Sequence, residues 1–492
     1  RKISIYESVL VVKIRDIIQL LDTPILGGDL EHQITSVTSD SRSVLPGAVF
    51  VCIIGKTYDG HDFINEAIDK GAILIISERK LYNFDIIGLI QIDSPRDALA
   101  KISYALYCNS IKKLHLSGIT GTNGKTSTSF MVHHIMRSAE KKTGLIGTIK
   151  YDLGNRILSA QRTTPEADEL CEYLGEMIRC NCDSAVMEVS SHAIDLKRVS
   201  EILFDIVVFT NLSHDHLDYH ENIEKYFDVK SQLFFQLKKD GIAVINYDCP
   251  YGRRLKDKLS VPIIGYGKSH DAQIRAEKIK TTMKGTSFYL NSPWGNGIIK
   301  MPLLGKFNVD NALAAVAVTG AYGLPFSLIQ KSLKNISYVP GRLELVRSFK
   351  KRFVFIDYAH TPDALEVVLN SIRLLIKGEI WLVFGCGGNR DKKKRRLMGK
   401  IASIHADKII ITSDNPRKED PVAICQDIIQ GFDDINIPYI ETDRKQAIEY
   451  ALKNMKRNDA LLVAGKGHEI YQEINGMLIP FDDRNVINEC LR

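Results

Sequence analysis

Continuous apolar runs alternate with segments of helical periodicity along most of the chain. Runs that suit strands buried on both faces cover residues 48–54, 72–76, 113–119, 185–189, 206–210, 353–357, 380–384, 408–412 and 460–464. Helical patterns cover residues 63–70, 226–237, 308–322, 362–375 and 445–455, and another starts at Lys125. This order is typical of βαβ units, so it predicts an α/β fold with mostly parallel sheets.

The length and the breaks in this pattern indicate three domains. At about 100–200 residues per domain, a chain of 492 residues suggests three. We expect a small α/β domain at residues 1–110, a central domain with a mostly parallel sheet at residues 111–340, and a Rossmann-like α/β domain at residues 341–492. Pro340 and Gly341 mark a hinge before the last of these.

Composition excludes several classes of protein. Lys and Arg number 65 and Asp and Glu 59, so the net charge of +6 is too weak to indicate nucleic-acid binding. The basic run 392–396 is interpreted as a solvated helix start or loop, with a local anion site as the alternative. Nine scattered cysteines without a C-x-x-C pair indicate reduced thiols. Reduced thiols favour a cytoplasmic protein. No apolar stretch reaches the roughly 18 residues that span a bilayer.

A glycine-rich turn follows the run at 113–119 and opens the next helix. It reads Gly118-Ile119-Thr120-Gly121-Thr122-Asn123-Gly124-Lys125-Thr126. Glycines let the backbone wrap a phosphate, while N–H groups and the helix dipole point at it. Lys125 would neutralise the β and γ oxygens, and Thr126 would offer its hydroxyl to Mg²⁺. Ile119 replaces the first glycine of the strict pattern, so a chance Gly-Lys-Thr stays an alternative. ATP is favoured over GTP because no N-K-x-D segment fits.

Two further apolar runs end in candidate metal ligands. Glu188 lies at the end of a strand, where α/β sheets collect ligands, and is interpreted either as an oxygen ligand for Mg²⁺ or as a cap of the next helix. The run 206–210 is followed by His214, Asp215, His216, Asp218 and His220. Zinc is an alternative there, but no cysteine lies near and Mg²⁺ already suits an ATP enzyme. A helical lysine such as Lys230 is, taken alone, a solvated charge.

Taken in order, these segments resemble the Mur ligases, which make the peptide of bacterial cell-wall precursors. The resemblance is carried by residues 121–126, 187–192, 210–220 and 357–362, and it runs through essentially the whole chain. Residues 40–42 and 46–47 resemble the N-terminal uridine-nucleotide domain of the member that adds the third residue of that peptide. Residues 414–417, Asp-Asn-Pro-Arg, resemble the selectivity motif of members that add meso-diaminopimelate. The guanidinium of Arg417 could bind the distal carboxylate of that amino acid with two hydrogen bonds, and it would repel the ammonium of lysine.

The resemblance implies an ATP-dependent, ADP-forming acid–amino-acid ligase of peptidoglycan synthesis, and hence a role in cell shape and division. Such an enzyme joins meso-diaminopimelate to the D-glutamate of UDP-N-acetylmuramoyl-L-alanyl-D-glutamate through an acyl phosphate, with ATP and Mg²⁺. The three domains would bind the UDP substrate, ATP and the amino acid in that order, and we expect a monomer. Three alternatives stay open: the L-lysine-adding ligase, a folylpolyglutamate-synthetase-like ligase, and a nucleotide-binding scaffold without turnover.

Matched to the family's motifs, the resemblance implies four groups of site residues. ATP would be bound by Gly121, Thr122, Asn123, Gly124, Lys125, Thr126, Asn308, Asn311, Arg342, Asp357 and His360. The UDP substrate would be bound by Ser39, Ser41, Lys56, Thr57, Tyr58, Thr163, Thr164, Ser190 and Arg198. Diaminopimelate would be bound by Arg390, Asp414, Asn415, Pro416, Arg417, Gly465 and Glu469. Mg²⁺ would be held by Thr126, Glu188, His216 and Lys230, the last as a carbamate. Catalytic roles fall to Lys125, Lys230 and His216.

The chain departs from the family pattern at three positions. His214 stands where an arginine is common, Arg162 precedes Thr163 where many relatives have an uncharged residue, and Leu196 replaces a polar residue near Arg198. These departures bear on how the muramoyl peptide is bound and leave the reaction class unchanged.

Overall fold

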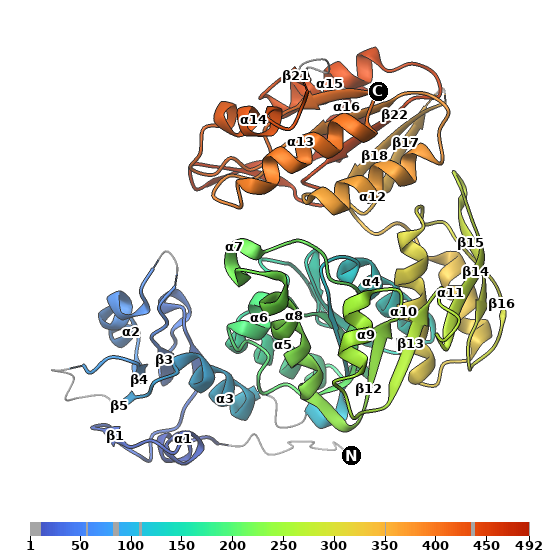
Figure 1. Ribbon diagram of the computed structural model, residues 1–492. Coiled ribbons are helices and arrows are strands. Elements are labelled where there is room, and N and C mark those ends of the chain that lie inside the picture. The colour runs from blue at the N-terminus through green and yellow to red at the C-terminus, as the bar shows by residue number, and fades with distance from the viewer. Residues whose placement is uncertain are drawn as a thin grey trace, which may run out of the picture. The chain divides into compact units, whose positions relative to one another are not determined.

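The computed structural model describes residues 11–491 apart from 56–57, 82–87, 108–110, 350 and 434–437 (Figure 1). The chain divides into two compact units. The first comprises Arg1–Gly118, Lys141–Val207 and Val229–Gly241, and the second comprises Ile119–Glu140, Val208–Asp228 and Ile242–Arg492. Within the described ranges, no helix is both long enough and apolar enough to cross a membrane.

A five-stranded sheet lies in the N-terminal part of the first unit. Its order is β1-β5-β4-β3-β2, parallel from β2 to β5 with an antiparallel edge at β1. The strands are β1 (Ile25–Leu26), β2 (Ser36–Thr38), β3 (Ala48–Val51), β4 (Ala72–Ser77) and β5 (Gly88–Gln91). Helices α1 (Ile14–Leu21) and α3 (Pro95–Tyr107) share one core with Val49 and Leu74. Helix α2 (Ile64–Asp69) shares a second core with Phe50. Alternate residues of β3 thus enter different cores, as the period of a strand requires.

The middle of the chain forms an eleven-stranded sheet in the order β16-β15-β14-β13-β12-β11-β6-β10-β7-β8-β9. The strands are β6 (His115–Thr120), β7 (Thr143–Ile146), β8 (Lys150–Asp152), β9 (Ile157–Ser159), β10 (Ser184–Glu188), β11 (Phe204–Phe209), β12 (Leu237–Asn246), β13 (Ile263–Gly267), β14 (Ile274–Thr282), β15 (Gly285–Asn291) and β16 (Gly297–Met301). Pairing is parallel for β7 with β10 and along β12-β13-β14, and antiparallel in the edge groups β14-β15-β16 and β7-β8-β9.

The helices of the same stretch connect these strands. They are α4 (Lys125–Ser138), α5 (Ala167–Arg179), α6 (Ser191–Asp195), α7 (Leu217–His220), α8 (Ile223–Gln232), α9 (Pro250–Lys256), α10 (Phe307–Ala321) and α11 (Phe326–Asn335). Helix α10 is buried along most of its length and packs against α4, the helix that opens at Lys125. Both helices belong to the second unit, and α4 directly follows the glycine-rich turn.

The C-terminal part of the second unit is a six-stranded sheet in the order β17-β18-β22-β19-β20-β21, parallel except for β17. The strands are β17 (Glu344–Phe349), β18 (Arg352–Asp357), β19 (Ile380–Phe384), β20 (Lys408–Ile411), β21 (Tyr439–Ile440) and β22 (Ala460–Ala464), followed by the hairpin of β23 (Tyr471–Ile474) and β24 (Met477–Pro480). The helices are α12 (Pro362–Arg373), α13 (Lys393–His405), α14 (Pro421–Ile429), α15 (Arg444–Asn454) and α16 (Asp483–Cys490).

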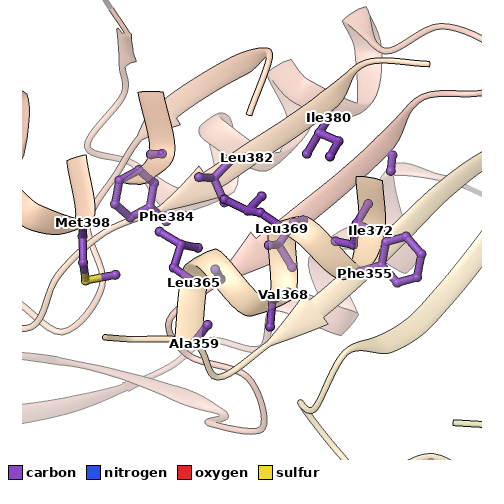
Figure 2. Packing of buried hydrophobic residues seen from close by; sticks show 14 of the residues in the cluster. Phe355, Ala359, Leu365, Val368, Leu369, Ile372, Ile380, Leu382, Phe384 and Met398 are labelled. Atoms are coloured by element: carbon purple, nitrogen blue, oxygen red, sulfur yellow. The ribbon is translucent and has the colours of Figure 1, made fainter. Parts of the chain in front are cut away.

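Helices cover both faces of this C-terminal sheet. Leu365, Leu369 and Ile372 of α12 point toward Phe355 and Leu382 of the strands, in a core that α13 and α14 also enter (Figure 2). The alternate strand residues pack in a second core with α15 and α16. A parallel sheet covered on both faces is a doubly wound α/β layer, and such sheets bind ligands at the carboxyl ends of their strands.

The structure confirms the α/β fold with mostly parallel sheets. The strands expected at 380–384 and 460–464 have those bounds, and the other expected strands differ by a few residues at their ends. The helix expected at 226–237 begins and ends earlier than expected. It is α8, which spans Ile223–Gln232 and is followed by a 3₁₀ turn at Leu233–Gln236. Leu233 and Phe234 are buried, and the tighter turn brings both into the core before β12 begins.

The basic run 392–396 does open a helix, α13, but the expectation of a solvated run is wrong for one residue. Arg395 is only 1% exposed, and its guanidinium is paired with Glu419 and Asp427. The sequence offers no sign of this, because both carboxylates follow it by many residues.

Candidate active site

The glycine-rich turn lies between β6 and α4, at the carboxyl end of a sheet strand. Gly121 has φ +143°, and a Cβ there would lie 1.9 Å from Thr210 Oγ1. Gly124 has φ +88°, and its Cβ would lie 2.4 Å from Asn311 Oδ1. Both positions therefore require glycine, for backbone conformation and for space. Lys125 Nζ donates to the carbonyls of Gly121 and Thr122, each at 2.9 Å, so the ammonium lies over the turn.

The end of β11 holds the turn in this shape. The N–H of Thr122 donates to the Asn211 carbonyl at 2.8 Å, and the N–H of Asn123 donates to Asn211 Oδ1 at 2.9 Å. The Thr210 hydroxyl donates to the Asn123 carbonyl at 2.6 Å. Thr210 and Asn211, which open the segment 210–220, thus fix the glycine-rich turn, and the sequence analysis did not give them this role.

Two buried amides of α10 support the turn from another side. The Asn311 amide nitrogen donates to Asn308 Oδ1 at 3.0 Å, and the Asn308 amide nitrogen donates to the Leu304 carbonyl at 2.7 Å. Asn308 is 1% and Asn311 6% exposed. These hydrogen bonds give the two buried amides the partners that buried polar groups need, and they leave Asn311 Oδ1 facing Gly124.

The segment after the hinge contributes to the same loop through Arg342. Its Nη2 donates to the Thr126 hydroxyl at 3.0 Å, and its guanidinium lies 4.7 Å from the centre of the Tyr358 ring. Asp357 Oδ2 accepts the N–H of Leu343 at 2.5 Å and Oδ1 accepts the N–H of Ala359 at 2.7 Å. Burial raises the pKa of Asp357 to about 6, against the opposing charge of Arg342. Asp357 thereby fixes the backbone at Leu343, next to Arg342, and at Ala359, next to Tyr358.

His360 and Asp215 interact electrostatically, and Lys125 acts on the same carboxylate. Burial and the charge of Lys394 lower the pKa of His360 to about 4, so its ring is neutral near pH 7, and Nδ1 donates to the Tyr358 carbonyl at 2.8 Å. Burial raises the pKa of Asp215, but nearby positive charges, His216 first and also Lys394 and Lys125, outweigh it and leave the pKa below its usual value. His216 has φ +54°, and its Nε2 lies 3.4 Å from Asp215 Oδ2.

In the first unit, Glu188 at the end of β10 organises a group of hydroxyls. The N–H of Thr148 donates to Glu188 Oε1 at 2.9 Å, and its hydroxyl donates to Oε2 at 3.0 Å. The Thr163 and Thr148 hydroxyls lie 3.1 Å apart, and the Thr164 hydroxyl donates to the Glu188 carbonyl at 2.9 Å. The interpretation of Glu188 as the cap of the next helix is wrong, because the Ser190 hydroxyl caps α6. Four of the residues expected to surround the muramoyl peptide and metal are thus brought together here.

Arg198 completes this group. Its Nη1 donates to the Thr164 carbonyl at 3.1 Å, and its Nη2 lies 2.6 Å from Glu166 Oε1. Burial lowers the pKa of this guanidinium, and Glu166 opposes that effect. Arg96 of α3 lies 3.5 Å from the other oxygen of Glu166, so Glu166 joins the five-stranded sheet's helix to the residues around Glu188. Sequence reasoning missed Glu166, Arg96 and Thr148, since nothing in their spacing indicates these contacts.

Two of the residues expected on the uridine side, Ser39 and Ser41, follow β2 directly. The N–H of Ser39 donates to Asp168 Oδ2 at 3.2 Å, and the Ser41 hydroxyl donates to Glu66 Oε2 at 2.9 Å. Tyr58 is 72% exposed. Lys56 and Thr57 lie outside the described residues.

At the carboxyl ends of β20 and β22, buried polar side chains form one network. The Asn415 amide nitrogen donates to Glu469 Oε2 at 2.8 Å, and Lys466 Nζ donates to Glu469 Oε2 at 3.1 Å and to Asn415 Oδ1 at 3.2 Å. Asp414 Oδ2 would lie 2.4 Å from a Cβ at Gly465, so that position also requires glycine. Burial raises the pKa of Glu469, which Lys466 opposes. Lys466 lies between Gly465 and Glu469, which were both expected in the site, but it was not itself expected there.

Arg417 lies on the rim of this network with a partly exposed side chain. It has φ +55°, and its N–H donates to the Glu473 carbonyl at 2.9 Å. Its Nε donates to Glu473 Oε2 at 2.8 Å and its Nη1 donates to the Gly388 carbonyl at 2.8 Å, while the side chain stays 23% exposed. Arg390 is exposed on the neighbouring loop, and the Pro416 carbonyl is packed against Gly388. The arrangement presents a fixed cation at the carboxyl edge of the sheet, which suits an anionic group of a ligand.

Within the described residues, no group of three or more His, Cys, Asp and Glu is arranged to hold a metal ion. The donor set expected for Mg²⁺ consists of the Thr126 hydroxyl, the Glu188 carboxylate, the His216 imidazole and Lys230. Thr126, Glu188 and Lys230 are buried. The hydroxyl and carboxylate are hard oxygen donors that fit Mg²⁺, whereas a lysine fits a cation only once a carbamate has replaced its positive charge by oxygens.

Three family models match the chain: the Mur ligase family catalytic domain at residues 33–105, the Mur ligase middle domain at 119–319 and the Mur ligase glutamate ligase domain at 341–467. A curated UDP-N-acetylmuramoyl-L-alanyl-D-glutamate–2,6-diaminopimelate ligase from Bacillus licheniformis is 44% identical over 478 residues, which cover 96% of this chain and 97% of that protein. The chain belongs to the Mur ligase family. This confirms the family inferred from the sequence.

Solved structures agree with the assignment to the Mur ligases. A structure of UDP-N-acetylmuramoyl-L-alanyl-D-glutamate–2,6-diaminopimelate ligase matches with a TM-score of 0.68 and 30% identity, covering 98% of this chain and 99% of that one. A Mycobacterium tuberculosis folylpolyglutamate synthase, complexed with ADP and AMPPCP, matches with a TM-score of 0.61 and 19% identity, covering 75% of this chain and 92% of that one. At that identity the second likeness shows a shared fold alone.

Proposed function

We propose that this Mur ligase joins meso-diaminopimelate to the D-glutamate of UDP-N-acetylmuramoyl-L-alanyl-D-glutamate, with ATP as the second substrate. The observation that carries the proposal is Arg417, held by Glu473 and Gly388 at the carboxyl edge of the C-terminal sheet with part of its guanidinium exposed. Curated relatives with this activity in their names, at 44% and 41% identity over almost the whole chain, support it.

The chemistry follows from the groups on each side of the reaction. The carboxylate of D-glutamate attacks the γ-phosphorus of ATP, forming an acyl phosphate and releasing ADP. The amine of diaminopimelate then attacks the acyl carbon, the amine loses a proton, and phosphate leaves with the formation of the amide. Positioning and neutralisation of charge contribute most to phosphoryl transfer. Lys125 over the turn suits the neutralising role, since its ammonium already binds carbonyl oxygens there.

The same proposal includes Mg²⁺, held by Thr126, Glu188, His216 and a carbamylated Lys230. When bound, Mg²⁺ offsets the negative charge of the transferring phosphoryl group. Glu188 is held for such a role by the two hydrogen bonds from Thr148, which orient both carboxylate oxygens. Hydrogen-bonded partners of this kind orient metal ligands and tune their affinity.

Selectivity for diaminopimelate over L-lysine is assigned to Arg417. The distal end of diaminopimelate carries a carboxylate that a guanidinium binds bidentately, whereas lysine presents only an ammonium there. A lysine-adding ligase would have no use for a fixed cation at this position. A folylpolyglutamate-synthetase-like activity has only the shared fold in its favour.

The test is phosphate release from ATP with the UDP-muramoyl dipeptide, Mg²⁺ and one of meso-diaminopimelate, L-lysine or L-ornithine. We expect release with diaminopimelate alone, and in Arg417→Ala a rise in the KM for diaminopimelate of at least about 100-fold, which corresponds to about 2.7 kcal/mol of lost binding to a charged group. Lys418→Ala, one residue further along, is the control and should keep the wild-type KM. An unchanged KM in Arg417→Ala, or equal turnover with lysine, would overturn the assignment.

A further inference from the structure

The basic run 392–396 places one arginine behind the loops assigned to the amino-acid substrate. Arg395 lies on the first turn of α13 and is 1% exposed. Its Nη1 donates to Glu419 Oε2 and to Asp427 Oδ2, both at 2.9 Å, and its Nη2 donates to Glu419 Oε1 at 3.0 Å. The guanidinium is therefore bound bidentately to Glu419 and shared with Asp427, the geometry in which such pairs are strongest.

The same ion pair reaches the loop 387–390, which carries Arg390. Nη2 of Arg395 donates to the Gly387 carbonyl at 3.3 Å, and the N–H of Asn389 donates to Glu419 Oε1. The N–H of Lys418 donates to Asn389 Oδ1 at 3.1 Å. Arg395 and Glu419 thus bind both the loop 387–390 and the segment that follows Arg417.

The two loops touch closely in front of this pair. The N–H of Gly388 donates to the Asn415 carbonyl at 2.9 Å, and Arg417 Nη1 donates to the Gly388 carbonyl at 2.8 Å. A Cβ at Gly388 would lie 1.9 Å from the Pro416 carbonyl oxygen, so the backbones are in contact. Any displacement of loop 387–390 would therefore carry the Arg417 guanidinium with it.

We propose that Arg395, with Glu419 and Asp427, is a positioning residue that holds the loop of Arg390 against the loop of Arg417 and so sets the affinity for the amino-acid substrate. The inference rests on the proposed function, since it assigns both loops to diaminopimelate. Breaking a buried ion pair leaves an uncompensated charge that must move toward water, and the loops bound to it move as well. A small displacement of a bidentate guanidinium is enough to weaken its contacts.

The pair stays charged throughout the range in which an enzyme of this kind works. The hydrogen bonds from Arg395 hold the pKa of Glu419 at about 2, against the effect of burial. A neutral glutamine at 419 therefore removes a charge that is present at every pH above about 3, and the effect of that substitution should not depend on pH between 6 and 9.

Glu419→Gln and Arg395→Lys test the proposal, with Arg373→Lys as a matched control. Arg373 Nη2 donates to Asp407 Oδ2 at 2.5 Å and its Nη1 donates to the Gly378 carbonyl at 3.3 Å, so it also joins a carboxylate and a glycine carbonyl. Gly378 precedes β19, however, whereas Gly387 follows it. The control therefore lies at the amino end of this strand, and Arg395 acts at its carboxyl end.

We expect both test variants to raise the KM for meso-diaminopimelate about tenfold or more, which corresponds to about 1.4 kcal/mol, because the positioning of two cations is lost. The kcat and the KM values for ATP and the UDP substrate should stay within about twofold, since no reacting group moves. Arg373→Lys should leave all four constants at their wild-type values. A rise shared by all three KM values, an equal rise in Arg373→Lys, or no rise would overturn the proposal.

A second measurement is independent of turnover. Amide hydrogen exchange of the substrate-free protein should be faster at residues 388–390 and 415–418 in Arg395→Lys than in the wild type, and unchanged there in Arg373→Lys. Unchanged exchange at these amides would contradict the proposal that Arg395 holds the two loops together. Wild-type protein that releases no phosphate with diaminopimelate would instead refute the proposed substrate, and the exchange result would still decide whether Arg395 holds the loops.

Discussion

Asp357 and His360 lie three residues apart, and burial moves their pKa values in opposite directions. It raises that of Asp357 to about 6 and, with the charge of Lys394, lowers that of His360 to about 4. Both shifts favour the neutral form of the group relative to its ordinary pKa, because burial in a low dielectric disfavours charge. The sequence placed these two residues in one candidate site, but both shifts are caused first by burial, which depends on the folded packing and which no sequence pattern indicates.

The pKa of His360 predicts a pH-dependent contribution to stability. Its folded pKa, about 4, lies below the ordinary 6.5, so the unfolded chain binds more protons between these values and the free energy of unfolding falls as pH drops from 6.5 to 4. His360→Gln should lose this dependence. The difference in unfolding free energy between wild type and variant should shrink by roughly 1 to 3 kcal/mol over that window.

Urea unfolding at pH 4 to 8 measures this difference, with fluorescence of Trp381 in β19 as the probe and Trp294→Phe as the background. Between pH 7 and 8 the difference should be constant, which serves as an internal control. A difference that stays flat down to pH 4, or grows as pH falls, would contradict the neutral, buried state of His360.

Single elements show where sequence reasoning succeeds. The turn between β6 and α4 is recognisable because its glycines, lysine and threonine are consecutive, and β19 and β22 are recognisable as uninterrupted apolar runs. The antiparallel strands β14, β15 and β16 were not foreseen, because their alternating pattern is shared by many exposed segments. Contacts such as Thr148 with Glu188 and Arg395 with Glu419 join residues far apart along the chain, and only the folded packing reveals them.

The turn between β6 and α4 should tolerate no side chain at Gly121. Gly121→Ala would bring a Cβ to 1.9 Å from Thr210 Oγ1, so the end of β11 and the turn must separate. We expect substrate-dependent phosphate release to fall by at least about 100-fold, because a displaced turn no longer presents Lys125.

Gly323→Ala is the control for this substitution. Gly323 has φ +82°, and nothing lies within 4 Å of an added Cβ. It should lower the free energy of unfolding by about 1 kcal/mol and leave kcat within about twofold. Wild-type kcat/KM for ATP in Gly121→Ala would show that the turn does not depend on its contact with Thr210.

For the whole molecule, the family and the α/β architecture could be inferred from the sequence, and both are confirmed by relatives that match almost the full chain. The boundaries at residues 110 and 340 stay predictions, as do the roles of individual site residues. The structure gathers those residues into groups around Lys125, Glu188 and Asp414, each at the carboxyl ends of strands. A ligase that works through an acyl phosphate must keep that group from water until the amine attacks.

The amino acid that the enzyme adds decides whether Arg417 has the role proposed for it. The most direct measurement is the mass of the product formed from ATP, Mg²⁺ and UDP-N-acetylmuramoyl-L-alanyl-D-glutamate when equal concentrations of meso-diaminopimelate and L-lysine compete. We expect a UDP-muramoyl tripeptide heavier than the dipeptide by one diaminopimelyl residue, with ADP and phosphate formed in equal amounts. A product that carries a lysyl residue would contradict the role assigned to Arg417, and ADP formed without any tripeptide would contradict the ligase itself.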